Sequence, residues 1–160
     1  MNAFFFPRLH KVEAPALYNL RTWSTGEVLD VDVESALCSN PALCDILAPS
    51  VFALDHIGFG GCTIEWKDSE FGADNVYAWG KEQKGEASHQ MFCDWMQRNN
   101  LSQDAAATAL GISPRTVRRY ATAQSSIPRR IWLACLGREA IGGLPRRPLP
   151  LALPTQAGRQ

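Results

Sequence analysis

Residues 101–128 read LSQDAAATALGISPRTVRRYATAQSSIP, and this stretch predicts two short helices joined by a tight turn. Ser102 is placed to cap the first helix, because its hydroxyl oxygen can accept a hydrogen bond from an unpaired backbone N–H. Gly111 ends that helix, since glycine adopts the left-handed cap conformation without a Cβ clash. Ser113 and Pro114 then begin the second helix as its cap and its first helical residue.

The side chains of this stretch divide into two faces. The apolar residues that would pack the helices together are Ala106, Ala107, Leu110, Ile112, Val117 and Tyr120. Arg115 and Arg119 are four residues apart, so they share a different face of the second helix. The pattern therefore predicts a buried apolar face and a basic face that is open to a partner.

This arrangement resembles the helix-turn-helix of the λ-repressor and Cro-like family, the XRE-type regulators. The resemblance rests on Gln103, Ala107, Gly111, the apolar packing residues, and Ile127-Pro128 at the start of the next helix. It implies that a recognition helix at residues 114–124 enters the DNA major groove while the preceding helix supports it. It also implies a transcriptional regulator, most often a repressor, that binds double-stranded DNA as a homodimer.

The resemblance and the arginine spacing together give the candidate DNA contacts. Arg115 and Arg119 can each make paired hydrogen bonds with guanine O6 and N7. Gln103 matches the family's phosphate-contacting glutamine, and Thr116 could contact a thymine methyl group or a phosphate. Pro114 has no side-chain donor, so base readout at its position is apolar or absent. The remaining candidates are Ser113, Arg118, Arg129 and Arg130.

The net charge of zero hides an asymmetry between the two halves of the chain. Residues 1–85 hold six basic and twelve acidic residues, a net charge of −6. Residues 86–160 hold ten arginines and four acidic residues, a net charge of +6. The asymmetry favours two domains, of which only the second approaches a polyanion.

Residues 9–79 are typical of a small α+β domain with one antiparallel sheet and short helices. Alternating apolar residues in 17–23 and 29–33 predict a hairpin. Residues 34–47 predict one or two short helices broken at Asn40-Pro41, and 51–57 and 62–66 predict further strands. The predicted fold class is therefore α+β, with this sheet domain followed by an all-α λ-repressor-like domain.

The N-terminal half resembles a bacterial domain-of-unknown-function family of small sheet domains. The resemblance rests on Tyr18, Leu20, Trp23, Gly26, Val31, Asp32, Pro49, Phe52, Ile64, Trp66 and the run Asp74-Asn75-Val76-Tyr77. Members are encoded alone, near toxin–antitoxin-type genes, or fused to a repressor-like domain. The resemblance implies a genomic setting and no catalytic chemistry.

Composition suggests where the domains end. The polar, glycine-containing stretch GKEQKGEAS at 80–88 predicts a linker. We therefore expect a sheet domain at 1–80, a linker at 81–88, a helix-turn-helix domain at 89–143 and a flexible proline-rich tail at 144–160.

Other functional classes have weaker support in the sequence. No catalytic set is placed by the sequence, so we expect neither an enzyme nor a cofactor. The three histidines lie far apart, and Asp30, Asp32 and Glu34 are more typical of a solvated strand face than of a metal site. The odd cysteine count, without a C-x-x-C pair, and the absence of a long apolar run favour a cytoplasmic protein outside the membrane.

Two alternative functions remain open at this stage. The acidic domain could bind a basic, toxin-like protein while the helical domain serves only as a scaffold. Alternatively, a small ligand beside Trp23 and Trp66 could control a DNA-binding regulator. Salt-dependent DNA binding, co-purification of a partner, and a ligand-dependent rise in melting temperature would distinguish the three possibilities.

Overall fold

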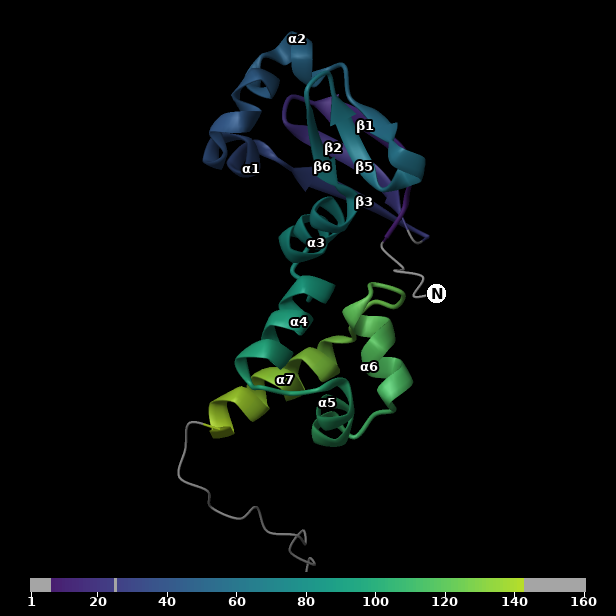
Figure 1. Ribbon diagram of the computed structural model, residues 1–160, viewed down its shortest axis with the longest axis vertical. Helices are drawn as coiled ribbons and strands as arrows, with labels where there is room; N and C mark the ends of the chain where they lie inside the picture. Colours follow the sequence, from purple (N-terminus) through teal and green to yellow (C-terminus); the bar gives the residue numbers. More distant parts are fainter. Residues whose placement is uncertain (1–6, 25, 143–160) are drawn as a thin grey trace, which may run out of the picture.

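The computed structural model describes residues 7–24 and 26–142, so the predicted tail at 144–160 lies outside the described residues. The described chain forms two three-stranded antiparallel sheets, followed by helices. Figure 1 shows the sheets at one end of the molecule, the C-terminal helices at the other end, and helix α3 (Ala73–Gln83) between them.

The first sheet has the strand order β1 (Leu9–Ala16), β2 (Asn19–Ser24) and β3 (Glu27–Asp32). The hairpin predicted from alternation is confirmed as β2–β3, in which Leu20 lies opposite Val31 and Thr22 opposite Leu29. These four side chains are buried, because alternate residues of a strand point to the same face. The sequence did not reveal β1, an edge strand in which only Leu9 is buried.

The second sheet has the order β4 (His56–Gly58), β5 (Thr63–Trp66) and β6 (Ser69–Gly72). The expectation of one small sheet is therefore wrong. Residues 51–57 do not form a single strand, because Pro49–Phe52 forms the short helix α2 and only His56–Gly58 is extended. The strands of residues 56–72 pair with one another rather than with the hairpin at 19–32.

Short helices connect the two sheets. Helix α1 (Glu34–Ser39) and the 3-10 helix η1 (Pro41–Leu47) confirm the two pieces predicted on either side of Asn40-Pro41. The side-chain oxygen of Asn40 accepts a hydrogen bond from the backbone N–H of Ala42 at 3.0 Å and so caps η1. Apolar residues of this region complete the core beneath the sheets.

Helix α3 packs against β3 at very short range. A Cβ atom on Gly80 would lie 2.9 Å from Cγ2 of Val31, so only glycine fits this contact without a shift. The helix continues to Gln83 and includes the buried side chain of Lys81, although residues 81–88 were expected to form a linker. The wider division of the chain into domains stays a prediction.

The C-terminal region is helical, with α4 (His89–Arg98), α5 (Gln103–Leu110), α6 (Pro114–Ala121) and α7 (Arg129–Gly142). Phe92 and Trp95 of α4 form the centre of its core together with Val117 and Cys135. The indole nitrogen of Trp95 donates a hydrogen bond to the carbonyl oxygen of Cys135 at 2.9 Å. This bond ties α4 to α7.

The predicted architecture of one sheet domain followed by an all-α repressor-like domain is corrected by these observations. The fold is a mixed α+β arrangement with a second sheet in the middle of the chain. Ala123, which follows α6, packs in the same buried cluster as the sheet residues. All five cysteines are free, and every helix in the described part of the chain is too short or too polar to cross a membrane.

Candidate nucleic-acid interface

Helices α5 and α6 are joined by the tight turn that the sequence predicts. The hydroxyl oxygen of Ser102 accepts a hydrogen bond from the backbone N–H of Ala105 at 3.1 Å, which caps α5. Ser113 caps α6 in the same way, through the backbone N–H of Thr116 at 3.1 Å. Gly111 has a φ angle of 65°, a left-handed conformation that favours glycine. Local sequence therefore fixes both helix ends at the turn.

The buried face of α6 holds it against its neighbours. Val117 and Tyr120 are buried, as are Ala106 and Ala107 on α5. The ring of Tyr120 meets that of Phe92 edge-to-face, with 5.8 Å between ring centroids. This packing fixes the orientation of α6 and leaves its opposite side in solvent.

The exposed side of α6 forms a basic hollow. Arg115, Arg118 and Arg119 line it together with Gln124, and its volume is about 680 Å³. Within residues 7–24 and 26–142, no acidic side chain forms an ion pair with any of the three arginines. An unpaired group of guanidinium groups attracts anions, and their paired N–H donors suit phosphate and guanine. We call this group of four residues the α6 basic hollow.

The other predicted contacts lie outside this hollow. Gln103 is exposed at the first residue of α5, and Arg129 and Arg130 are exposed at the start of α7. The hydroxyl groups of Ser113 and Thr116 lie 2.8 Å apart and bond to each other. The structure thus brings three of the eight predicted residues together, and their roles in DNA contact stay predictions.

Gln124 is the lining residue that sequence reasoning missed. It lies beyond the end of α6, but Ala123 has a φ angle of 56° and redirects the chain. The backbone N–H of Gln124 then bonds to the carbonyl oxygen of Arg119 at 2.9 Å, which holds Gln124 beside the arginines. Only its place within the predicted recognition helix at 114–124 hinted at this position.

The residues of the alternative ligand and metal sites considered from the sequence have other partners. Trp66 is buried, and its indole nitrogen donates to the carbonyl oxygen of Phe52 at 3.0 Å. Trp23 lies instead beneath the ammonium group of Lys11, 4.6 Å from the ring centroid. The carboxylate of Asp30 binds Arg21, and no metal-binding group of histidine, cysteine or acidic residues occurs among the described residues.

The chain is similar over nearly its whole length to a protein of known crystal structure from Nitrosomonas europaea. The two sequences are 58% identical, and the match covers 97% of this chain and 100% of the other, with a TM-score of 0.84. The chain belongs to the same family as that protein. The Nitrosomonas europaea member of the family is described as a "putative DNA binding protein". No protein-family model and no curated protein matches the chain.

Proposed function

We propose that this protein is a sequence-specific DNA-binding transcriptional regulator and not an enzyme. The observation that carries the proposal is the α6 basic hollow, in which three arginines of one helix face solvent and form no ion pair with an acidic side chain of the described residues. Helices α5 and α6 act as a helix-turn-helix, with α6 in the major groove and α5 behind it.

The first turns of α6 suit base readout. Arg115 lies in the first turn and Arg119 lies one turn later on the same face, so both can reach base edges from a helix in the groove. Arg118 and Gln124 flank them and suit phosphate oxygens or neighbouring bases. Arginine can bond guanine O6 and N7 together, which makes guanine the preferred base at these positions.

Phosphate contacts come from neighbouring elements. Gln103 is exposed at the N-terminus of α5, where free backbone N–H groups favour an anion. Arg129 and Arg130 are exposed at the start of α7 and add positive charge. The net charge of +6 in residues 86–160 supports attraction to a polyanion from a distance.

The description of the Nitrosomonas europaea family member supports DNA as the partner. We further propose that the protein acts in the bacterial cytoplasm as a repressor of antitoxin-like type. Two copies would bind two half-sites one helical turn apart, about 34 Å along the duplex.

Fluorescence anisotropy with two duplexes tests this proposal. One duplex carries the DNA upstream of the protein's own gene, and the other carries a scrambled sequence of equal length. We expect the upstream duplex to bind at least about a thousandfold more tightly, the lower limit for specific regulators. Equal affinity for both duplexes would contradict a sequence-specific regulator.

A further inference from the structure

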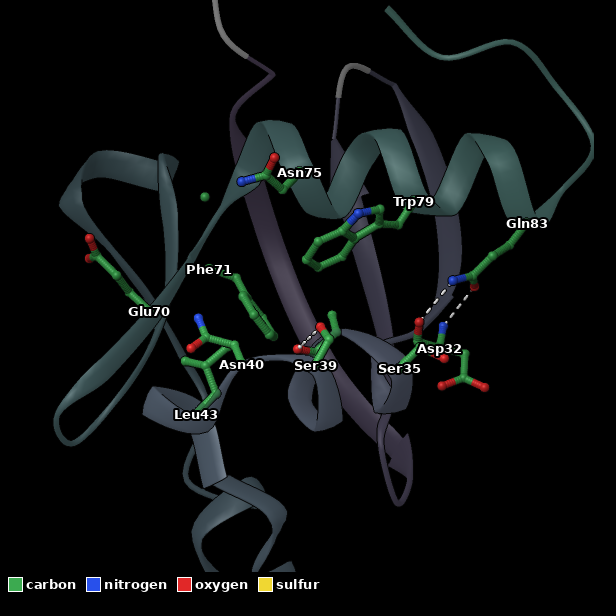
Figure 2. Close-up of a pocket in the computed structure, with 12 residues that line it drawn as sticks. Asp32, Ser35, Ser39, Asn40, Leu43, Glu70, Phe71, Asn75, Trp79 and Gln83 are labelled. Atoms are coloured by element: carbon green, nitrogen blue, oxygen red, sulfur yellow. Dashed lines mark hydrogen bonds between the residues drawn. The ribbon is translucent and has the colours of Figure 1, made fainter. Parts of the chain in front are cut away.

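A second hollow lies on the sheet end of the molecule, between α1, β6 and α3, and has a volume of about 700 Å³. Strand β6 borders it with Glu70, Phe71 and Gly72. Figure 2 shows Phe71 and Trp79 beside each other at its middle, and the two rings meet edge-to-face with 5.3 Å between centroids. We call this hollow the β6 edge groove. It shares no lining residue with the α6 basic hollow.

The groove runs along an unpaired strand edge. Strand β6 is the last strand of its sheet, with β5 on its other side. The backbone N–H of Ala73 donates to the carbonyl oxygen of Cys62 at 2.7 Å, which marks a hydrogen-bonded position of the β5–β6 ladder. Such positions alternate in an antiparallel pair, so the backbone polar groups of Gly72 and Glu70 point away from β5. Among the described residues, no backbone hydrogen bond outside the ladder and helices uses the N–H of Gly72 or either group of Glu70.

The opposite wall of the groove, at the end of β3, has its outward backbone groups covered. The side-chain amide of Gln83 donates to the carbonyl oxygen of Asp32 at 2.8 Å and accepts from its backbone N–H at 2.8 Å. This amide takes the place of a neighbouring peptide group. The fold therefore satisfies the edge of β3 internally and leaves the edge of β6 open to a partner.

The charges beside this edge favour a basic partner. His56, Glu65 and Glu70 lie opposite one another in a row across the second sheet. Glu65 lies 3.6 Å from Nε2 of His56, but Glu70 forms no ion pair with a described residue. Like charges directly opposite each other are destabilising, so a cation on the free side of Glu70 would relieve this repulsion. No lysine, arginine or histidine is among the described residues that line the groove.

We propose that the β6 edge groove binds an extended, basic segment of a protein partner as an additional strand. The segment pairs through its backbone with the outward groups of Glu70 and Gly72. Alternate residues of a strand point to opposite faces, so a lysine or arginine beside Glu70 is followed by an apolar residue on the side of Phe71 and Trp79. An acidic segment is disfavoured because Glu70 and Glu65 would repel it.

Titration of the ¹⁵N-labelled full-length protein with short peptides at low salt tests this proposal without DNA. The probe is acetyl-KLKLK-amide, in which basic and apolar residues alternate in either strand direction. We expect it to shift the amide resonances of β6 and the indole N–H resonance of Trp79. Acetyl-KKLLK-amide has the same composition without the alternation and should bind more weakly, and acetyl-ELELE-amide should not bind.

Two variants of Gly72 test the backbone pairing. Gly72 has φ and ψ angles of −64° and 136°, which proline can adopt, so Gly72→Pro removes the outward N–H without removing a ladder bond. Gly72→Ala is the matched control, because it brings the same Cβ atom close to the Asp74 carboxylate but keeps the N–H. We expect the proline variant to bind KLKLK about two- to tenfold more weakly than the alanine variant, the effect of one backbone hydrogen bond.

Glu70→Gln tests the charge without changing the backbone. It should weaken KLKLK by about two- to fivefold, since it removes one solvated ion pair. Asp68→Asn is its control, because Asp68 is exposed on the same hairpin but does not line the groove. The proposal is overturned if KLKLK does not shift the β6 resonances, or if KKLLK or ELELE binds as tightly. Equal binding by the two Gly72 variants, or equal weakening by Asp68→Asn and Glu70→Gln, would also overturn it.

Discussion

The ammonium nitrogen of Lys81, on α3, lies 3.2 Å from the hydroxyl oxygen of Ser126, in the connection between α6 and α7. The same nitrogen donates to both carboxylate oxygens of Glu27, at 3.1 and 3.2 Å, and to Glu86. Burial lowers the pKa of Lys81, but its bonds to Glu86 and Glu27 outweigh this effect and hold the pKa above its ordinary value. A charged lysine thus joins the first sheet, α3 and the segment that follows α6.

Lys81→Met should lower the free energy of unfolding by about 1–3 kcal/mol, because three polar partners lose their bonds to a charged group. The loss stays below that of a fully buried pair, since Glu27 and Glu86 remain partly hydrated. Urea denaturation measures it. Lys84→Met is the control: Lys84 reaches the same two carboxylates from an exposed position, and we expect a change below about 1 kcal/mol. Equal losses of unfolding free energy in Lys81→Met and Lys84→Met would show that the burial of Lys81 is unimportant.

The close packing of α3 on β3 gives a second prediction. Gly80→Ala should destabilise the fold by about 1–3 kcal/mol, because the new methyl group meets Val31 and Leu29 at 2.9–3.0 Å. Gly137→Ala, on α7, should instead stabilise it by up to about 1 kcal/mol, since within 4 Å the new methyl group would meet no described atom beyond the adjacent backbone of its own helix, and alanine favours a helix. Urea midpoints of the two variants should move in opposite directions; movement in the same direction contradicts the predicted packing.

His89 predicts a dependence of stability on pH. Burial lowers the pKa of His89 below its ordinary value of 6.5, although Asp74 and Glu82 partly offset the effect. As the pH falls below about 6.5, the unfolded chain binds a proton before the folded chain does, so stability decreases until the pH passes the folded pKa.

Thermal melts across this range measure that dependence. We expect the stability of the wild-type protein to fall more steeply with decreasing pH than that of His89→Gln. Parallel slopes of stability against pH for His89→Gln and the wild-type protein would contradict this role of His89.

Base readout by α6 gives a fourth prediction. Arg119→Ala should reduce binding to the specific duplex by about 1–3 kcal/mol more than binding to scrambled DNA, because it removes a base-edge contact. Arg138→Ala removes an exposed arginine of α7 and should affect both duplexes little. Competition binding measures the two affinities, and an equal loss on both duplexes for Arg119→Ala would exclude base readout by this residue.

Sequence reasoning succeeded where the determining contacts are local. The alternation of Leu29 and Val31 with Asp30 predicted β3, and the caps at Ser102 and Ser113 predicted α5 and α6. The four-residue spacing of Arg115 and Arg119 predicted that they share a face, and both line the α6 basic hollow.

Sequence reasoning failed where partners are distant in the chain. Strand β4 has only three residues, too few for a periodic pattern to appear. Lys81 lies in a polar stretch that is typical of a linker, and its partner Glu27 is more than fifty positions away in the sequence. The hollow beside Trp79 could not be predicted from the sequence, because its opposite wall is formed by Asp32 and α1.

The salt dependence of DNA binding tests the central claim most directly. Anisotropy should show the affinity of the wild-type protein for its upstream duplex falling linearly, on logarithmic axes, by at least about tenfold between roughly 50 and 200 mM salt. Arg118→Gln should reduce the slope by about one if Arg118 contacts a phosphate, whereas Arg138→Gln should leave it unchanged. Affinity that stays flat with salt, or a slope that Arg138→Gln changes as much as Arg118→Gln does, would contradict DNA binding through the α6 basic hollow.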